Sequence, residues 1–432
     1  MSSKKGKLGL LSIILLGINA VIGSGIFLMP GQAYALMGTN SLWVYIFDAL
    51  LVIAMVMCYA EVGGMFTQTG GAYIYAREAF GEFVGFEVGI MRWVMCTVSW
   101  ATMAVGFTTA LANIMPSAAD PAVRNIIVVS LIVGLGIVNI IGIDCTKYLN
   151  NIITTGKLIP LIVFVGVGVF FIKGGNFTAP SGVETGVSNF SQAAMLIFYA
   201  FTGFESIAVA AGDMANPKKD VPIASFAVML LVSAIYLLVQ AVSIGTMGPA
   251  LATSTAPIAE ASGQFLGSLG GVLVTVGTLV SIGGINLTAA FITPRNVYAL
   301  AEDGLVPRVL AKTGKRNTPY IAIIISVLIT IPVALSGTFT QLAVLSVVAR
   351  FILQYIPTCL SVLVLRKRED LKSTYTAPFG WAMPVISVVV SIWLLMKSSP
   401  KQLIWGMIAL AVIAPLYFVM KRVRENESGA KS

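Results

Sequence analysis

Histidine is missing from this sequence of 432 residues, and charged residues make up only 10% of it. The chain therefore has no imidazole to ligate a metal or to relay protons. A soluble protein would carry roughly a quarter charged residues, so the composition excludes an ordinary soluble domain. The four cysteines are scattered through apolar stretches, which argues against both a metal site and a disulfide framework. We expect no cofactor.

Apolar residues form 57% of the chain, and the mean hydropathy is +0.92. A run of about 20 apolar residues makes a helix long enough to cross a bilayer. On that criterion we predict an all-α polytopic membrane protein with twelve transmembrane helices, at residues 8–36, 41–66, 84–113, 124–143, 149–172, 188–212, 223–248, 262–300, 319–336, 340–365, 379–397 and 402–420.

The basic residues predict the orientation of these helices. Lys and Arg are concentrated in the two tails and in the loops on the same side, whereas the opposite loops hold Arg124, Lys173, Lys397 and Lys401. Basic loops stay in the cytoplasm, so we expect both termini there, in a multi-pass protein of the cell membrane. The net charge of +9 follows from this topology and does not indicate nucleic-acid binding.

The connecting loops are too short to contain a nucleotide-binding domain, and no G-x-x-x-x-G-K-[ST] motif occurs. Any transport would then depend on gradients or on exchange, without ATP. No pairing of a nucleophile with a base is visible, so we do not expect an enzyme.

Two predicted helices carry an interruption near their midpoints. The first contains Gly23-Ser24-Gly25-Ile26-Phe27, and the sixth contains Phe201-Thr202-Gly203-Phe204-Glu205. Irregular backbone at membrane depth is tolerated only where it lines a protein cavity, and paired interruptions are typical of the binding site of a secondary transporter. We therefore divide the chain into a first repeat at 1–172, a second at 188–366, two extra helices at 379–420 and a tail at 421–432.

Four sequence blocks resemble the amino acid–polyamine–organocation superfamily, and in particular its L-amino acid transporters. They are the first interruption, Gly70–Tyr75 with Phe80-Gly81, Phe201–Ser206 continuing to Asn216–Ala224, and Glu302–Pro307. The resemblance implies the leucine-transporter-type fold, which consists of two inverted five-helix repeats. It also implies an amino acid as substrate, a lipid environment, and a monomer or a weak homo-oligomer.

The resemblance also implies how the substrate is bound. The α-carboxylate would lie on the first interruption, at Gly23, Ser24, Gly25 and Ile26, where freed amides begin a half-helix with a partial positive charge. The α-ammonium would lie on carbonyl groups near Ala20 and Ile22 and on the stretch from Tyr199 to Thr202 and Gly203. Alternatively, Gly23 and Gly25 merely allow close packing of helices.

Aromatic residues line the second interruption. By resemblance, Tyr199 and Phe201 would close over the substrate as a gate, whereas Phe198 and Phe204 are more simply explained by packing. Glu205 has two interpretations, as a proton carrier or as an acceptor for loose backbone amides.

Lys157 lies inside the fifth predicted helix. In sodium-independent relatives, a lysine at the matching place puts its ammonium where sodium-coupled relatives hold an ion. The resemblance therefore implies sodium-independent transport, with Lys157 in a coupling role that Glu205 would share as a proton carrier. The alternative is that Lys157 extends to the cytoplasmic interface. We expect the other intramembrane charges, on Asp48, Glu61, Arg92 and Arg350, to be structural pairs or interface residues.

Specificity is suggested by the eighth helix. Arginine-handling relatives place a tryptophan where Ile285 stands, and a pocket of Gly, Ile, Thr and Phe suits neutral side chains. We therefore expect transport of neutral L-amino acids by exchange or proton symport with alternating access. The alternatives are a carrier of polyamines or cationic amino acids on the same fold, and a sensor that binds amino acids without moving them.

Overall fold

The computed structural model describes residues 9–66, 71–142, 148–178, 182, 183, 185–209, 214, 216–314, 318–373 and 375–429. The first predicted repeat contains α1 (Leu10–Val21), α2 (Ser24–Met37), α3 (Ser41–Gly63), α4 (Ala72–Phe80), α5 (Glu82–Leu111), α6 (Pro121–Ile141) and α7 (Tyr148–Gly168), and the short α8 (Gly175–Thr178) follows it. The rest of the chain contains α9 (Val187–Phe201), α10 (Glu205–Val209), α11 (Pro217–Met247), α12 (Pro257–Glu302), α13 (Tyr320–Leu335), α14 (Phe339–Arg350), α15 (Ile356–Leu365), α16 (Ala382–Lys397) and α17 (Pro400–Gly429).

Each of the twelve predicted apolar runs coincides with one of these helices or with a consecutive set of them. Seven helical stretches in the described part of the chain are long and apolar enough to cross a membrane, and four shorter apolar helices accompany them. Large apolar side chains lie exposed on the outer helices, among them Ile126, Leu269, Val389 and Val412. Such side chains suit hydrocarbon, and the protein is a multi-pass membrane protein.

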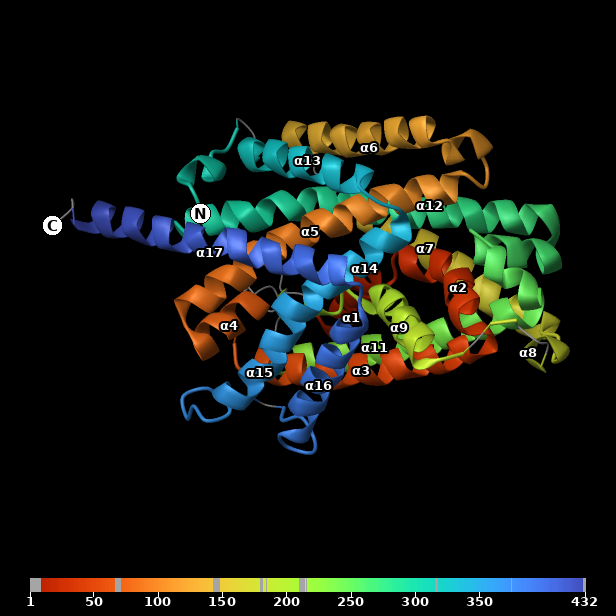
Figure 1. Cartoon of the computed structure of the whole chain (residues 1–432), viewed down its shortest axis with the longest axis horizontal. Helices are drawn as coiled ribbons and strands as arrows, with labels where there is room; N and C mark the ends of the chain where they lie inside the picture. The colour runs from red at the N-terminus through yellow and green to blue at the C-terminus, as the bar shows by residue number, and fades with distance from the viewer. Residues whose placement is uncertain are drawn as a thin grey trace.

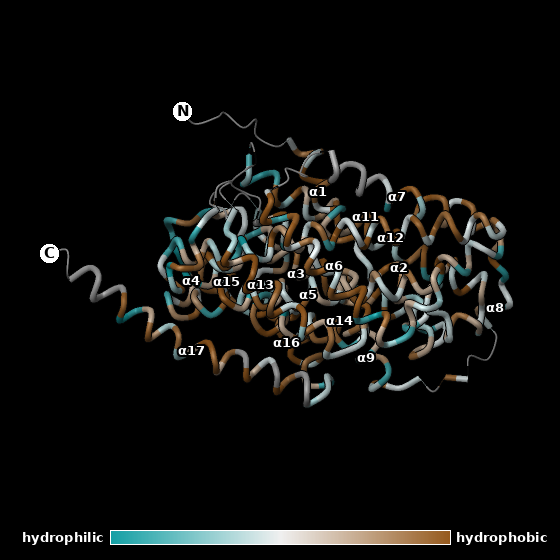
Figure 2. Tube along the Cα trace, turned by 90° about the horizontal axis from the view of Figure 1, so that it is seen from above, coloured by the Kyte–Doolittle hydropathy of each residue, from teal (hydrophilic) through white to brown (hydrophobic). Residues whose placement is uncertain are grey.

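The helices run mostly along the long axis of the molecule (Figure 1). α3 packs along α11, and α5 packs along α12. In both views α4 and the end of α17 lie toward one end of the molecule, whereas α8 lies at the other (Figures 1 and 2). Hydrophilic colour gathers near the α4 end, and the helices across the middle are largely hydrophobic (Figure 2). Because α4 and the end of α17 lie toward the same end, the chain crosses the membrane an even number of times between them. The predicted topology requires the same.

Two helices depart from the predicted pattern. α12 is 46 residues long, begins at Pro257 and contains a kink at Gly267, whose φ of 69° is a conformation that glycine tolerates best. Between α14 and α15, residues Phe351–Tyr355 form a π-helix. A π-helical turn does not change the mean hydropathy of an apolar run, so hydropathy could not reveal it.

Candidate functional site

The two interrupted helices meet at their interruptions. The first break lies at Ile22 and Gly23, between α1 and α2, and the second lies at Thr202, Gly203 and Phe204, between α9 and α10. Gly203 has a φ of +114°, and a Cβ atom built on it would lie 2.3 Å from the carbonyl oxygen of Ala20. The backbones of the two breaks are therefore in direct contact.

Both breaks are shorter than the sequence motifs that predict them. Gly25, Ile26 and Phe27 already belong to α2, and Phe201 and Glu205 end and begin regular helices. The first residues of a helix can adopt helical geometry before their amides gain partners, so the helix resumes earlier than the glycines suggest.

The start of α2 holds the residues expected to receive a carboxylate. Ser24, Gly25 and Ile26 are buried, and no side chain caps the helix. The Ser24 hydroxyl donates to Met103 Sδ at 3.2 Å and lies 3.5 Å from the Tyr199 hydroxyl. Uncapped amides at the N-terminus of a half-helix carry a partial positive charge, which suits an anion.

Gly23 and Gly25 face different neighbours. A Cβ atom on Gly25 would lie 2.7 Å from both Cα and Cβ of Ala200, so this glycine lets α2 pack closely on α9. A Cβ atom on Gly23 would instead lie 3.3 Å from Ile285 Cδ1 and 3.4 Å from Met103 Cε. Close packing therefore explains Gly25, whereas Gly23 opens on a group of side chains from α5 and α12 that includes Ile285.

We expect Gly23→Ala to weaken amino acid binding without unfolding the protein. The added methyl group would meet the flexible ends of Ile285 and Met103, which can shift, while it fills space beside the first break. The backbone φ of −120° at Gly23 is accessible to alanine. Ligand-induced thermal stabilisation of the purified protein measures the effect. A variant with the melting temperature and the alanine affinity of the parent would contradict it.

Several of the expected carbonyl groups already accept hydrogen bonds. The Tyr199 carbonyl accepts from Thr202 Oγ1 at 2.8 Å, and the Ala200 carbonyl lies 3.0 Å from the hydroxyl of Tyr236. The same hydroxyl lies 3.3 Å from the Val21 carbonyl, so Tyr236 of α11 joins the two breaks. A carbonyl oxygen has two lone pairs, so the Ala200 and Val21 carbonyl groups can accept a second donor, whereas the Tyr199 carbonyl also accepts from the Thr202 amide, at 3.2 Å.

Lys157 of α7 is fully buried, and its ammonium reaches the first break. It donates to the carbonyl oxygen of Asn19 at 2.6 Å and to that of Ile22 at 2.8 Å. The last carbonyl groups of a helix lack internal partners and carry a partial negative charge, so a cation is favourable there. The structure thus contradicts the alternative in which Lys157 extends to the cytoplasmic interface.

The two aromatic residues expected to form a gate lie in different surroundings. Tyr199 packs edge-on against Phe339 of α14, with ring centroids 5.9 Å apart, and its hydroxyl lies 3.5 Å from Met103 Sδ. Phe201 is fully buried and packs edge-on against Tyr236, at 5.1 Å. Tyr199 is therefore the aromatic residue beside Ser24, and the contacts of Phe201 favour a packing role.

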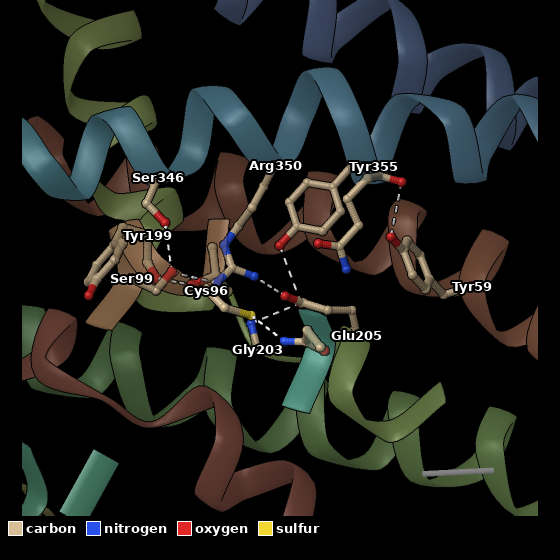
Figure 3. Close-up of polar contacts among 12 residues, drawn as sticks. Tyr59, Cys96, Ser99, Tyr199, Gly203, Glu205, Ser346, Arg350 and Tyr355 are labelled. Carbon is tan, nitrogen blue, oxygen red and sulfur yellow. Dashed lines mark hydrogen bonds and ion pairs between the residues drawn. The ribbon is translucent and has the colours of Figure 1, made fainter. Parts of the chain in front are cut away.

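Glu205 lies at the second break in a network of polar contacts (Figure 3). Its carboxylate accepts from the Gly203 amide at 2.9 Å and from the Tyr355 hydroxyl at 3.3 Å, and it forms an ion pair with Arg350. The expected role as an acceptor for a loose backbone amide is therefore present. Phe204 stacks on Tyr355, at 5.3 Å, which agrees with its expected packing role.

The other intramembrane charges were expected to be paired or at the interface. Glu61 forms a bidentate pair with Arg366, at 2.5 and 2.6 Å, as expected. Asp48 differs, because it is fully buried and its carboxylate oxygens have no hydrogen-bond partner.

Sequence reasoning missed Met103, Tyr236 and Phe339 as neighbours of the breaks. The stripe of residues Cys96, Ser99, Met103 and Phe107 follows helical spacing along α5, and all four side chains are partly exposed. That spacing, which places Cys96, Ser99 and Met103 on one face of α5, was the available signal. Nothing local distinguishes Tyr236 or Phe339 from ordinary packing residues.

A family profile and several known transporters match most of this chain. The amino acid permease family profile matches residues 8–419. A serine/threonine exchanger of Bacillus subtilis is 30% identical over 441 residues, covering 97% of each chain. An uncharacterized transporter of Mycobacterium tuberculosis is 30% identical over 420 residues, which cover 90% of this chain and 86% of the relative. The family profile match extends over both breaks and over Lys157.

Proposed function

Because this chain belongs to the amino acid permease family, we propose that it moves neutral L-amino acids across the cell membrane without sodium. It is a transporter and not an enzyme. The transport cycle uses exchange or proton symport with alternating access, and the amino acid is bound where the two helix breaks meet. The observation that carries this proposal is the contact between the breaks, with an uncapped helix N-terminus on one side and Lys157 on the other.

The substrate carboxylate lies at the first turn of α2, where Ser24 adds a hydroxyl to the free amides. Its ammonium lies on carbonyl groups of the two breaks, near Ala20, Ile22 and Phe201 to Thr202. The ring of Tyr199 closes over the bound molecule, since it already spans the space between Ser24 and Phe339.

The position of Lys157 supports sodium independence. A sodium ion bound at the end of α1 would need carbonyl oxygens as ligands, and the lysine ammonium holds two of them. The Lys157 ammonium replaces a transported cation as the group that links α7 to α1. Both termini face the cytoplasm in this proposal, and the protein works as a monomer or a weak homo-oligomer in lipid.

Uptake of labelled alanine, serine and leucine into proteoliposomes tests the proposal. We expect uptake that is unchanged when choline replaces sodium, and an excess of unlabelled neutral amino acid that competes at least about tenfold better than arginine, lysine or putrescine, a difference of about 1.4 kcal/mol. Preloading the vesicles with amino acid distinguishes exchange, which it accelerates, from symport.

Three results would overturn parts of this proposal. A strict requirement for sodium would remove the role given to Lys157. Preference for arginine or putrescine would favour the cationic carrier on the same fold. Binding of alanine without any uptake or exchange would indicate a sensor.

A further inference from the structure

We propose that Arg350 determines charge selectivity by neutralising Glu205. The part of the site that receives the substrate side chain then accepts neutral amino acids and rejects cationic ones. This inference rests on the proposed function and concerns the same site. It assigns Arg350 a role in specificity beyond holding the helices together.

The carboxylate that a cationic side chain would need is present at the second break. Glu205 binds the Gly203 amide, and Gly203 lies against Ala20 in the last turn of α1, beside the first break. Arg350 comes from α14, 145 residues away in the sequence, and its guanidinium lies against this carboxylate (Figure 3). The side chains of Arg350 and Glu205 are only 13% and 7% exposed, so water screens the pair weakly.

The pair lies close to the place proposed for the substrate carboxylate. Arg350 Nη2 donates to Ser99 Oγ at 2.9 Å, and Ser99 precedes Met103 by one turn of α5. Met103 in turn accepts the Ser24 hydrogen bond at the start of α2. Residues four apart on a helix are about 5 to 6 Å apart, which is the reach of an amino acid side chain.

This face of α5 is turned to the interior and is not completely covered. Cys96, Ser99 and Met103 are partly exposed. Each also has a hydrogen-bond partner on another helix, on α12, α14 and α2 respectively, so these side chains face the interior of the bundle. A substrate side chain that extends from Ser24 along α5 would thus reach Ser99 and the guanidinium beside it.

The helix that carries Arg350 has a geometry that serves this pairing. Arg350 and Tyr355 are five residues apart, and in an α-helix they would point about 140° away from each other. The π-helix from Phe351 to Tyr355 winds more residues into one turn, and both side chains reach Glu205. Ser346, one turn before Arg350, lies 3.0 Å from Ser99 and extends the same polar wall.

A paired guanidinium and carboxylate present no net charge to a substrate. A lysine or arginine side chain would have to displace Arg350 from Glu205, and a glutamate side chain would have to displace Glu205 from Arg350. Each exchange loses an established ion pair in a weakly hydrated place, whereas a neutral side chain leaves the pair intact.

Two single substitutions should therefore change charge preference in opposite directions. In proteoliposomes exchanging labelled alanine, Arg350→Met leaves the Glu205 carboxylate unpaired, and we expect lysine to improve as a competitor relative to alanine by about tenfold or more. Glu205→Gln leaves the guanidinium unpaired, and glutamate should improve by a similar factor. The double variant should return to the neutral preference of the parent.

The ion pair between Glu61 and Arg366 is the matched control, because it is also buried but lies elsewhere. Arg366→Met and Glu61→Gln can lower stability, yet neither should alter the ratio of lysine to alanine competition. Ser99→Asp provides a test that keeps the Arg350 pair, since it adds a negative charge beside it and should also favour lysine.

The outcomes separate the two proposals. Failure of the parent protein to take up or to exchange any neutral amino acid overturns the proposed function. Exchange by the parent, with unchanged competition ratios in folded Arg350→Met or, where that variant does not fold, in Ser99→Asp, overturns the role of Arg350 alone. An equal shift in the Arg366→Met control also overturns it.

Discussion

Lys157→Met is expected to lower the rate of amino acid exchange by about tenfold or more, which corresponds to about 1.4 kcal/mol in the barrier. The substitution keeps most of the length of the side chain but removes the ammonium that binds the carbonyl groups of Asn19 and Ile22. Hydrogen bonds to charged groups contribute about 1.5 to 3 kcal/mol each, and these two hold the end of α1 at the first break.

The measurement is exchange of labelled alanine at saturating and at low concentration, which separates rate from affinity. Lys173→Met is the control, because it removes the same charge from an exposed residue just beyond the end of α7. Its exchange rate should match that of the parent. A parental rate in a well-folded Lys157→Met protein would remove the coupling role of this lysine.

Gly203→Ala is expected to have the largest effect on stability, about 2 to 5 kcal/mol of destabilisation, and to abolish transport. The residue has a φ of +114°, which an L-amino acid adopts only with strain, and the new methyl group would overlap the carbonyl group of Ala20. Because that oxygen belongs to the backbone of the other broken helix, neither break can keep its position.

Thermal unfolding of the purified protein in detergent measures the loss, and alanine exchange measures its functional consequence. Gly186→Ala is the matched control at the opposite end of α9, where a Cβ atom meets nothing within 4 Å and φ is −142°. It should be nearly neutral. Equal melting temperatures for the two variants would show that the contact between the breaks is not critical.

The ion pair between Glu205 and Arg350 could be predicted only in part from the sequence. Glu205 was recognisable because a carboxylate at membrane depth is costly and needs a reason to be there. Its partner could not be recognised, because Arg350 was one of several intramembrane charged residues that were each expected to be structural. The choice between them depends on which helix faces α10, and on a π-helix that hydropathy does not detect.

The two glycines of the first interrupted motif, Gly23 and Gly25, are a second example. Their spacing identified an interrupted helix, but it offered binding and packing as alternative explanations for both. The structure separates them, because Gly25 lies against Ala200 while Gly23 lies against Ile285 and Met103. Two positions that are two residues apart face different neighbours. Only the packing of α2 in the bundle decides which neighbour each glycine meets.

The sequence by itself determined the helical membrane fold, the places where two helices break and the position of Lys157 inside the fifth predicted helix. These properties follow from apolar length, from glycine and from the cost of charge in hydrocarbon, which all act locally along the chain. The tertiary structure alone decided that Lys157 reaches Ile22, that Tyr199 rather than Phe201 lies beside Ser24, and that Arg350 neutralises Glu205. Those contacts depend on how each helix is rotated and placed against its neighbours, and the packing of the whole bundle sets that rotation.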